Sequence, residues 1–172
     1  INPEWLFRLF ETARAETVAF EDRGDEIRYT GRHHGYARLE QPVVHERTFR
    51  FRPGDGGLLI TDRLSGRGSH ACRWHFHLAP GVSATPGTSG EVLLESNAGR
   101  FLFLATDDMQ IIVSDVWYSP SYGMRVPCLA LDVAHTVAVT DRYTASFAVL
   151  RDAGGAVETR ARVRALWPEL GS

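Results

Sequence analysis

The sequence predicts an all-β fold, an antiparallel β-sandwich with short helical segments at its two ends. Short runs of alternating apolar and polar residues dominate from residue 16 onward, and Gly, Pro, Asn and Asp separate them, which favours antiparallel strands over βαβ units. The chain has 172 residues, 44% of them hydrophobic and 23% charged, so it can bury the core of one ordered domain. It contains no run of about 18 apolar residues that would predict a membrane span.

The alternating runs predict ten strands. They are expected near residues 17–22, 26–32, 42–52, 57–64, 69–79, 91–96, 100–106, 109–117, 130–140 and 143–151. At the amino-terminal end, Asn2 followed by Pro3 resembles a helix cap with proline at the first helical position, so WLFRLF is expected to form a short helix or a packed entry segment. The segment VETRARVRALW, residues 157–167, is the second predicted helix.

One hairpin can be derived residue by residue. PGDG at residues 53–56 joins two predicted strands, and pairing Arg52 with Gly57 places Arg47 opposite Asp62. The same register matches the apolar face of the first strand with that of the second, and a slip by one residue would break the match. We therefore expect a partly buried Arg47–Asp62 ion pair whose role is either structural or chemical.

Charge and cysteine content exclude little about function. The net charge is −2, so the chain lacks the basic excess that binds phosphate backbones, and nucleic acid is not an expected partner. All 19 basic residues are arginine, which fits either a GC-rich coding sequence or the recognition of carboxylates on acidic sugars. Cys72 and Cys128 lack a motif spacing, so they do not define the redox compartment.

His75 and His77 form a His-x-His pair on one predicted strand. Two such side chains leave the same face about 6.6 Å apart, which is a geometry that can hold a metal. The alternation places Trp74 and Phe76 in the core and both histidines on the outer face. No Glu follows within a few positions, and His135 is the only later histidine. Two surface histidines are therefore expected instead of a cupin-like metal site.

His33, His34 and Tyr36 lie beside Gly35 at the end of a predicted strand. Gly35 can provide an unusual backbone turn there, and the side chains could reach a groove. Tyr and His can act as base and acid in β-elimination. In the alternative interpretation, Tyr36 packs at the edge of the sandwich and its hydroxyl bonds to the backbone.

Three aromatic residues, Trp117, Tyr118 and Tyr122, flank or lie within the SPSYG segment at residues 119–123. Exposed aromatic faces can stack on sugar rings, whereas core or loop packing is the alternative. The sequence has no Gly-x-Ser-x-Gly, no phosphate loop and no Cys/His nucleophile arrangement, so hydrolase and nucleotide-binding functions have no support.

Several of these segments together resemble a known family, the heparinase II/III-like family of bacterial polysaccharide lyases, in its carboxy-terminal β-sandwich region. The resemblance is carried by the elements His33-His34-Gly35-Tyr36, His45-Glu46-Arg47, Asp62 through His70, His75 through Pro80 and, more weakly, SPSYG at 119–123. It implies β-elimination of a uronate-containing polysaccharide by a full-length protein.

The resemblance also implies a division of labour. Catalytic Tyr and His and the metal ligands of such lyases lie mainly upstream, on an α/α toroid and a preceding strand, so residues 1–172 are expected to be one sandwich domain of a larger, periplasmic or secreted protein. We expect no catalytic residue, cofactor or metal here, and we expect the domain alone to be inactive.

The expected partners are an acidic polysaccharide and the toroid. The alternatives are a non-catalytic carbohydrate-binding or scaffold module and a cupin-like metalloprotein. The predicted substrate-binding residues are His33, His34, Tyr36, His75, His77, Tyr118 and Tyr122.

Overall fold

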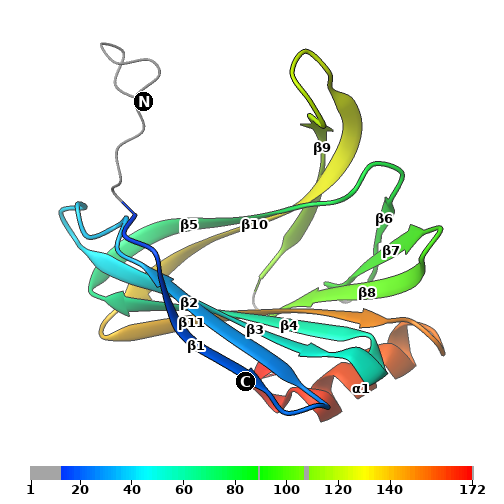
Figure 1. The fold of residues 1–172 in the computed structure, drawn as a ribbon, viewed down its shortest axis with the longest axis horizontal. Helices are drawn as coiled ribbons and strands as arrows, with labels where there is room; N and C mark the ends of the chain where they lie inside the picture. The colour runs from blue at the N-terminus through cyan, green and yellow to red at the C-terminus, as the bar shows by residue number, and fades with distance from the viewer. Residues whose placement is uncertain (1–12, 89, 107–108, 172) are drawn as a thin grey trace.

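The computed structural model describes residues 13–88, 90–106 and 109–171, and it contains two antiparallel sheets within these ranges (Figure 1). The large sheet has the strand order β1-β2-β3-β4-β11-β8-β7-β6, and the small sheet has the order β5-β10-β9. The strands are β1 (Glu16–Asp22), β2 (Ile27–His33), β3 (Val43–Arg52), β4 (Gly57–Gly66), β5 (Gly68–His77), β6 (Ser83–Pro86), β7 (Val92–Ser96), β8 (Gly99–Ala105), β9 (Ile111–Tyr118), β10 (Val126–Val139) and β11 (Arg142–Arg151). The predicted all-β sandwich is confirmed.

The core lies between the two sheets. Trp74 and Phe76 of β5 pack against Phe103 of β8 and Phe147 of β11, with ring centroids 4.9 to 5.6 Å apart for the pairs between sheets. Alternation along β5 directs these aromatics inward, and burying such rings removes much of the apolar surface from water. The small sheet is thereby held over the large one.

Helix α1 (Ala156–Leu166) covers part of the other face of the large sheet. Asp152 accepts hydrogen bonds from the Gly155 N–H and the Thr159 hydroxyl at the start of this helix, and Pro168 follows its end. Val163 and Trp167 are fully buried against a cluster from β4, β8 and β11. The predicted carboxy-terminal helix is therefore confirmed, whereas the predicted helix in WLFRLF lies outside the described residues.

The predicted strands differ from the structure in two places, since one strand was missed and another begins earlier than predicted. The four-residue strand β6 was missed, and it is a short edge strand that ends in Pro86, so it carries almost no alternation to detect. Strand β10 begins at Val126, before the predicted residue 130, and includes Pro127. Over residues 126–129 it pairs only with β9, and β5 joins at Ala130, so a residue without an N–H can be accommodated on the unpaired side.

The register of the β3–β4 hairpin is as predicted. Arg52 pairs with Gly57, Phe49 with Ile60, and Arg47 with Asp62. The turn is a 3-10 segment, Pro53–Asp55, closed by Gly56 with a φ of 61°, a left-handed conformation that favours glycine.

Two further observations concern the cysteines and the helices. Cys72 and Cys128 are free thiols, and burial raises the pKa of Cys72. Among the helices of the described part of the chain, none has the length and apolar character needed to cross a membrane.

Candidate functional site

The ends of β2 and β3 bring two histidines together. His33, the last residue of β2, pairs with His45 of β3, and their rings lie edge to face with centroids 4.9 Å apart. The His33 Nε2 lies 2.9 Å from the His45 Nδ1. The sequence separates these residues by the irregular segment 34–42, so their pairing depends on how β2 docks on β3.

Asp62 of β4 is the centre of the polar network below this histidine pair. Its side chain is 1% exposed. Oδ1 accepts hydrogen bonds from His45 Nε2 at 2.8 Å and from Arg47 Nε at 2.7 Å. Oδ2 accepts them from Arg47 Nη2 at 2.6 Å and from Trp74 Nε1 at 2.8 Å. A carboxylate has about four lone-pair positions, and donors from three side chains use them all.

The hydrogen bonds assign the protons of both histidines. The Gly35 N–H donates to His33 Nδ1 at 3.2 Å, so His33 carries its proton on Nε2 and donates it to His45 Nδ1. His45 then carries its own proton on Nε2 and donates to Asp62. Both rings are neutral in this arrangement, and neither retains a free lone pair. The network therefore offers no ligand to a metal ion.

Burial and hydrogen bonding shift the pKa values of Asp62, Arg47 and His33 in this network. Burial alone would raise the pKa of Asp62, but the hydrogen bonds from Arg47 and His45 outweigh it and lower that pKa. The hydrogen bond to Asp62 raises the pKa of Arg47. Burial, together with the neighbouring His45, lowers the pKa of His33. Asp62 and Arg47 are thus held charged, and His33 is held neutral.

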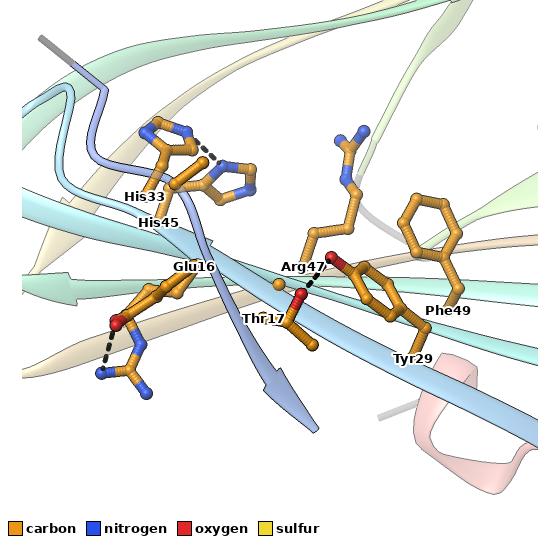
Figure 2. A pocket seen from close by; sticks show the side chains of 10 residues that line it. Glu16, Thr17, Tyr29, His33, His45, Arg47 and Phe49 are labelled. Carbon is orange, nitrogen blue, oxygen red and sulfur yellow. Dashed lines mark hydrogen bonds and ion pairs between the residues drawn. The ribbon is translucent and has the colours of Figure 1, made fainter. Parts of the chain in front are cut away.

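A pocket of about 470 Å³ lies over this network on the inner face of β1, β2 and β3, as Figure 2 shows. Its walls include His33, His45 and Arg47, and the rings of Tyr29 and Phe49 line it with centroids 6.4 Å apart. The Tyr29 hydroxyl is hydrogen-bonded to the Thr17 hydroxyl at 3.3 Å. We take this pocket as the candidate site, and we call it the β1–β3 pocket.

A second pocket, of about 420 Å³, shares His45 and Arg47 with the first. It is lined by the consecutive residues 70–75 of the edge strand β5 and also by Tyr36 and Leu39. The pair His45 and Arg47 therefore lies between two hollows.

Of the predicted site residues, His33 and Tyr36 lie close to His45, whereas His34 contacts Glu16. Tyr36 packs edge to face on His33 with centroids 5.2 Å apart, and among the described residues its hydroxyl has no hydrogen-bond partner, so the bond to the backbone considered for it is not formed. His34 lies 3.5 Å from the Glu16 carboxylate through Nε2. The expected unusual backbone at Gly35 was wrong, because Gly35 does not have a positive φ. Its small size is used instead, since an added Cβ would lie 3.2 Å from His33 Nδ1.

His75 and His77 are exposed on the outer face of the small sheet, as the alternation predicts. No Glu follows the pair in sequence, but the tertiary structure places a carboxylate beside it, because His75 Nδ1 contacts Asp132 of β10, the residue opposite it in the register. Asp132 also accepts a hydrogen bond from Ser114. Among residues 13–88, 90–106 and 109–171, no group of three or more His, Cys, Asp or Glu side chains is positioned to hold a metal.

The aromatic residues near SPSYG lie on the β9–β10 hairpin, which extends beyond the large sheet (Figure 1). Trp117, Tyr118 and Tyr122 are all exposed, so they are not core residues. The Arg125 guanidinium lies 4.5 Å from the centre of the Trp117 ring. The hairpin is therefore separate from the β1–β3 pocket.

Sequence reasoning missed Tyr29, Phe49 and Trp74 as contributors to the site. The register of the β3–β4 hairpin places Phe49 on the same face as Arg47, which is a signal that was available. Tyr29 joins them through the β2–β3 pairing, and Trp74 through the packing of one sheet on the other. Neither contact follows from local pattern.

Comparison with known protein families gives one match that covers most of the chain. The sequence profile of the family described as "Heparinase II/III-like, C-terminal" matches residues 7–153. No curated protein matches the sequence at a significant level.

Solved structures of polysaccharide lyases share this fold, and two of them serve as examples. The heparan sulfate lyase HepC from Pedobacter heparinus has a TM-score of 0.69 and 16% identity, over 83% of this chain and 22% of that protein. A heparinase III has a TM-score of 0.62 and 14% identity, over 84% of this chain and 22% of that protein. The chain thus spans about a fifth of the length of these lyases. Since the family profile covers most of its residues, the chain belongs to the heparinase II/III-like family, in which it forms the carboxy-terminal β-sandwich domain.

Proposed function

We propose that this domain belongs to a polysaccharide lyase that cleaves a uronate-containing polymer by β-elimination, and that it lines one side of the substrate cleft without performing the proton transfers. The family membership and the fold shared with a heparan sulfate lyase and a heparinase III support the activity class. The substrate and the activity are those of a full-length protein with an upstream α/α toroid.

One observation supports a binding role for this domain and leaves the proton transfers to residues elsewhere in the full-length protein. β-Elimination needs a base for the α-proton, an acid for the leaving oxygen and a group that neutralises the carboxylate. Every ring nitrogen of His33 and His45 is already hydrogen-bonded within the protein. These two histidines cannot exchange a proton with substrate unless the network breaks. The pocket is therefore better suited to binding and orienting a sugar than to acid–base catalysis.

The remaining predicted residues extend this binding surface in the proposal. Tyr36 and His75 both line the pocket that includes His45 and Arg47, and the Tyr36 hydroxyl has no hydrogen-bond partner among the described residues. His34, His77, Tyr118 and Tyr122 are exposed enough to contact a polymer that passes over the domain. A polymeric substrate of this kind is extracellular, so we propose a periplasmic or secreted location.

The test is an assay of unsaturated uronate formation by ultraviolet absorbance, with the full-length protein and a panel of uronate polymers. We expect activity from the full-length protein and none from the 172-residue chain when circular dichroism shows it to be folded. Activity from the chain alone would contradict the accessory role. A full-length protein that cleaves no polymer of the panel would contradict the lyase function.

A second candidate function, a non-catalytic carbohydrate-binding module, is favoured by the exposed aromatics of the β9–β10 hairpin. Trp117 and Tyr118 present large rings to solvent, which is a common way to stack on sugars. Binding of polymer that is lost in a Trp117→Ala and Tyr118→Ala double variant, together with an inactive full-length protein, would favour this function over the lyase.

A further inference from the structure

Asp62 fixes the guanidinium of Arg47, and one nitrogen of that guanidinium remains available. Its Nε and Nη2 donate to the two oxygens of Asp62, whereas Nη1 has no hydrogen-bond partner in the described part of the chain. The side chain is 34% exposed and lines the β1–β3 pocket. A bidentate contact with a buried carboxylate fixes the plane of a guanidinium. Asp62 therefore holds Arg47 in one orientation and leaves Nη1 available to a ligand.

An apolar surface lies next to this guanidinium. Figure 2 shows the rings of Tyr29 and Phe49 beside the Arg47 side chain, all on the same face of β2 and β3. The bond between the hydroxyls of Tyr29 and Thr17 restrains the tyrosine ring. Aromatic rings stack on the apolar face of a pyranose, and a guanidinium fork binds an oxyanion. A sugar ring with an acidic substituent presents both features.

The other charges around the pocket are paired. Arg32 lies 3.5 Å from Glu16 and 3.4 Å from Glu46, and Asp62 neutralises Arg47. His33 and His45 are neutral in the hydrogen-bond arrangement. The pocket thus has no large excess of positive charge to attract anions of every kind. Selection would depend on directed hydrogen bonds from Arg47 combined with ring stacking.

We infer that the β1–β3 pocket is a subsite for one acidic sugar residue, whose oxyanion binds Arg47 and whose ring packs on Tyr29 and Phe49. This inference deepens the proposed function and rests on it for the polymer class. The oxyanion is a carboxylate or a sulfate ester, and the volume of about 470 Å³ is within the usual range for small-ligand sites.

The experiment titrates the 172-residue chain by calorimetry with three oligosaccharides of equal length. The first is an unsulfated uronate-containing oligosaccharide, the second is its carboxyl-reduced form, and the third is a sulfated oligosaccharide without uronate. The carboxyl-reduced form has the same rings without the charge, and we expect it to bind about tenfold more weakly than the acidic form. Tighter binding of the third oligosaccharide than of the first would identify sulfate, instead of carboxylate, as the recognised group.

Two variants and a matched control assign the binding to this pocket. Arg47→Lys keeps a cation next to Asp62 but removes the free Nη1, and we expect about tenfold weaker binding of the acidic oligosaccharide. Tyr29→Leu removes part of the stacking surface at a partly exposed position, so it serves if Arg47→Lys does not fold. Arg28→Lys is the control, because residue 28 precedes Tyr29 and its side chain lies on the opposite face of the sheet, where affinity should be unchanged.

The outcomes separate this inference from the proposed function. Two results would overturn the subsite even if the full-length protein is an active lyase. The first is wild-type affinity in Tyr29→Leu and in folded Arg47→Lys. The second is equal binding of the acidic and carboxyl-reduced oligosaccharides without binding of the sulfated one. Conversely, binding that depends on Arg47 would support the subsite even if the full-length protein cleaves no polymer, and only the lyase function would then be contradicted.

Discussion

The indole Nε1 of Trp74 donates a hydrogen bond to Oδ2 of Asp62 across a distance of 2.8 Å, and this bond joins the small sheet to the large one. Trp74 lies on β5 and Asp62 on β4, which are consecutive strands in different sheets. Asp62 thereby connects the sandwich core with Arg47, which lines the β1–β3 pocket. The stability of the domain and the order of the pocket should therefore depend on the same carboxylate.

Removing the carboxylate should destabilise the fold strongly. Asp62→Ala leaves the Arg47 guanidinium without its partner and Trp74 without its acceptor, so we expect a loss of about 3 to 5 kcal/mol in the free energy of unfolding. Denaturant unfolding measures it. Asp115→Ala, at an exposed position of β9, is the control and should change that free energy by about 0.5 kcal/mol or less. Equal stability of the two variants would refute the structural role of Asp62.

Removing only the indole donor should cost less. Trp74→Phe retains an aromatic ring in the core but leaves Asp62 with one donor fewer, and hydrogen bonds to charged groups contribute about 1.5 to 3 kcal/mol. We expect a loss in this range by denaturant unfolding. Trp117→Phe changes an exposed tryptophan and should leave the stability unchanged. A Trp74→Phe variant as stable as wild type would mean that this bond contributes nothing.

Stability should decrease as the pH falls through the histidine range. The folded-state pKa of His33 is lowered, so the unfolded chain binds more protons and stability increases with pH. The contribution of His33 is complete above its ordinary pKa of about 6.5 and is lost as the pH falls through its folded pKa. The pKa of Asp62 is also lowered, and its contribution is lost only in stronger acid, below about pH 4.

The measurement is the free energy of unfolding between about pH 7 and 5. We expect His33→Asn to show a flatter dependence on pH than wild type in this window. His70→Asn is the control, because the His70 ring is hydrogen-bonded through Nε2 to the backbone carbonyl of Arg67, three residues before it in the chain. If His33→Asn and wild type have the same slope, His33 does not titrate as inferred.

Substitution of His33, His34 or Tyr36 in the full-length protein should weaken lyase activity modestly and should not abolish it. His33 lines the β1–β3 pocket, Tyr36 lines the second pocket, and His34 lies between them in the chain. The ring nitrogens of His33 are already bonded within the protein. We expect higher KM with smaller changes in kcat, measured by ultraviolet absorbance. Complete loss of kcat in a folded Tyr36→Phe variant would indicate that the hydroxyl of Tyr36 takes part in proton transfer.

The purified chain should bind no stoichiometric transition metal. His75 contacts Asp132, but no group of three His, Cys, Asp or Glu side chains is assembled around the pair among the described residues, so the set is short of the three or four ligands that zinc requires. Elemental analysis of the chain measures the metal content. One zinc, iron or manganese per chain that disappears in His75→Ala would overturn this prediction.

The sequence by itself determined the strands with clear alternation and the register of the β3–β4 hairpin. Alternation assigns each side chain to a face, and the short turn at residues 53–56 leaves one register that matches both apolar faces, so Arg47 had to lie opposite Asp62. The same alternation placed His75 and His77 outside and Trp74 inside. These are local relationships, and local pattern is enough to decide them.

Only the tertiary structure decided which partners these residues find. His33 pairs with His45 although the irregular segment 34–42 separates them in sequence. His75 contacts Asp132 because β10, which is distant from β5 in sequence, pairs with it. Trp74 reaches Asp62 because one sheet packs on the other. Contacts between distant segments depend on the docking of whole elements and on the closure of long loops, and no short-range periodicity encodes either of them.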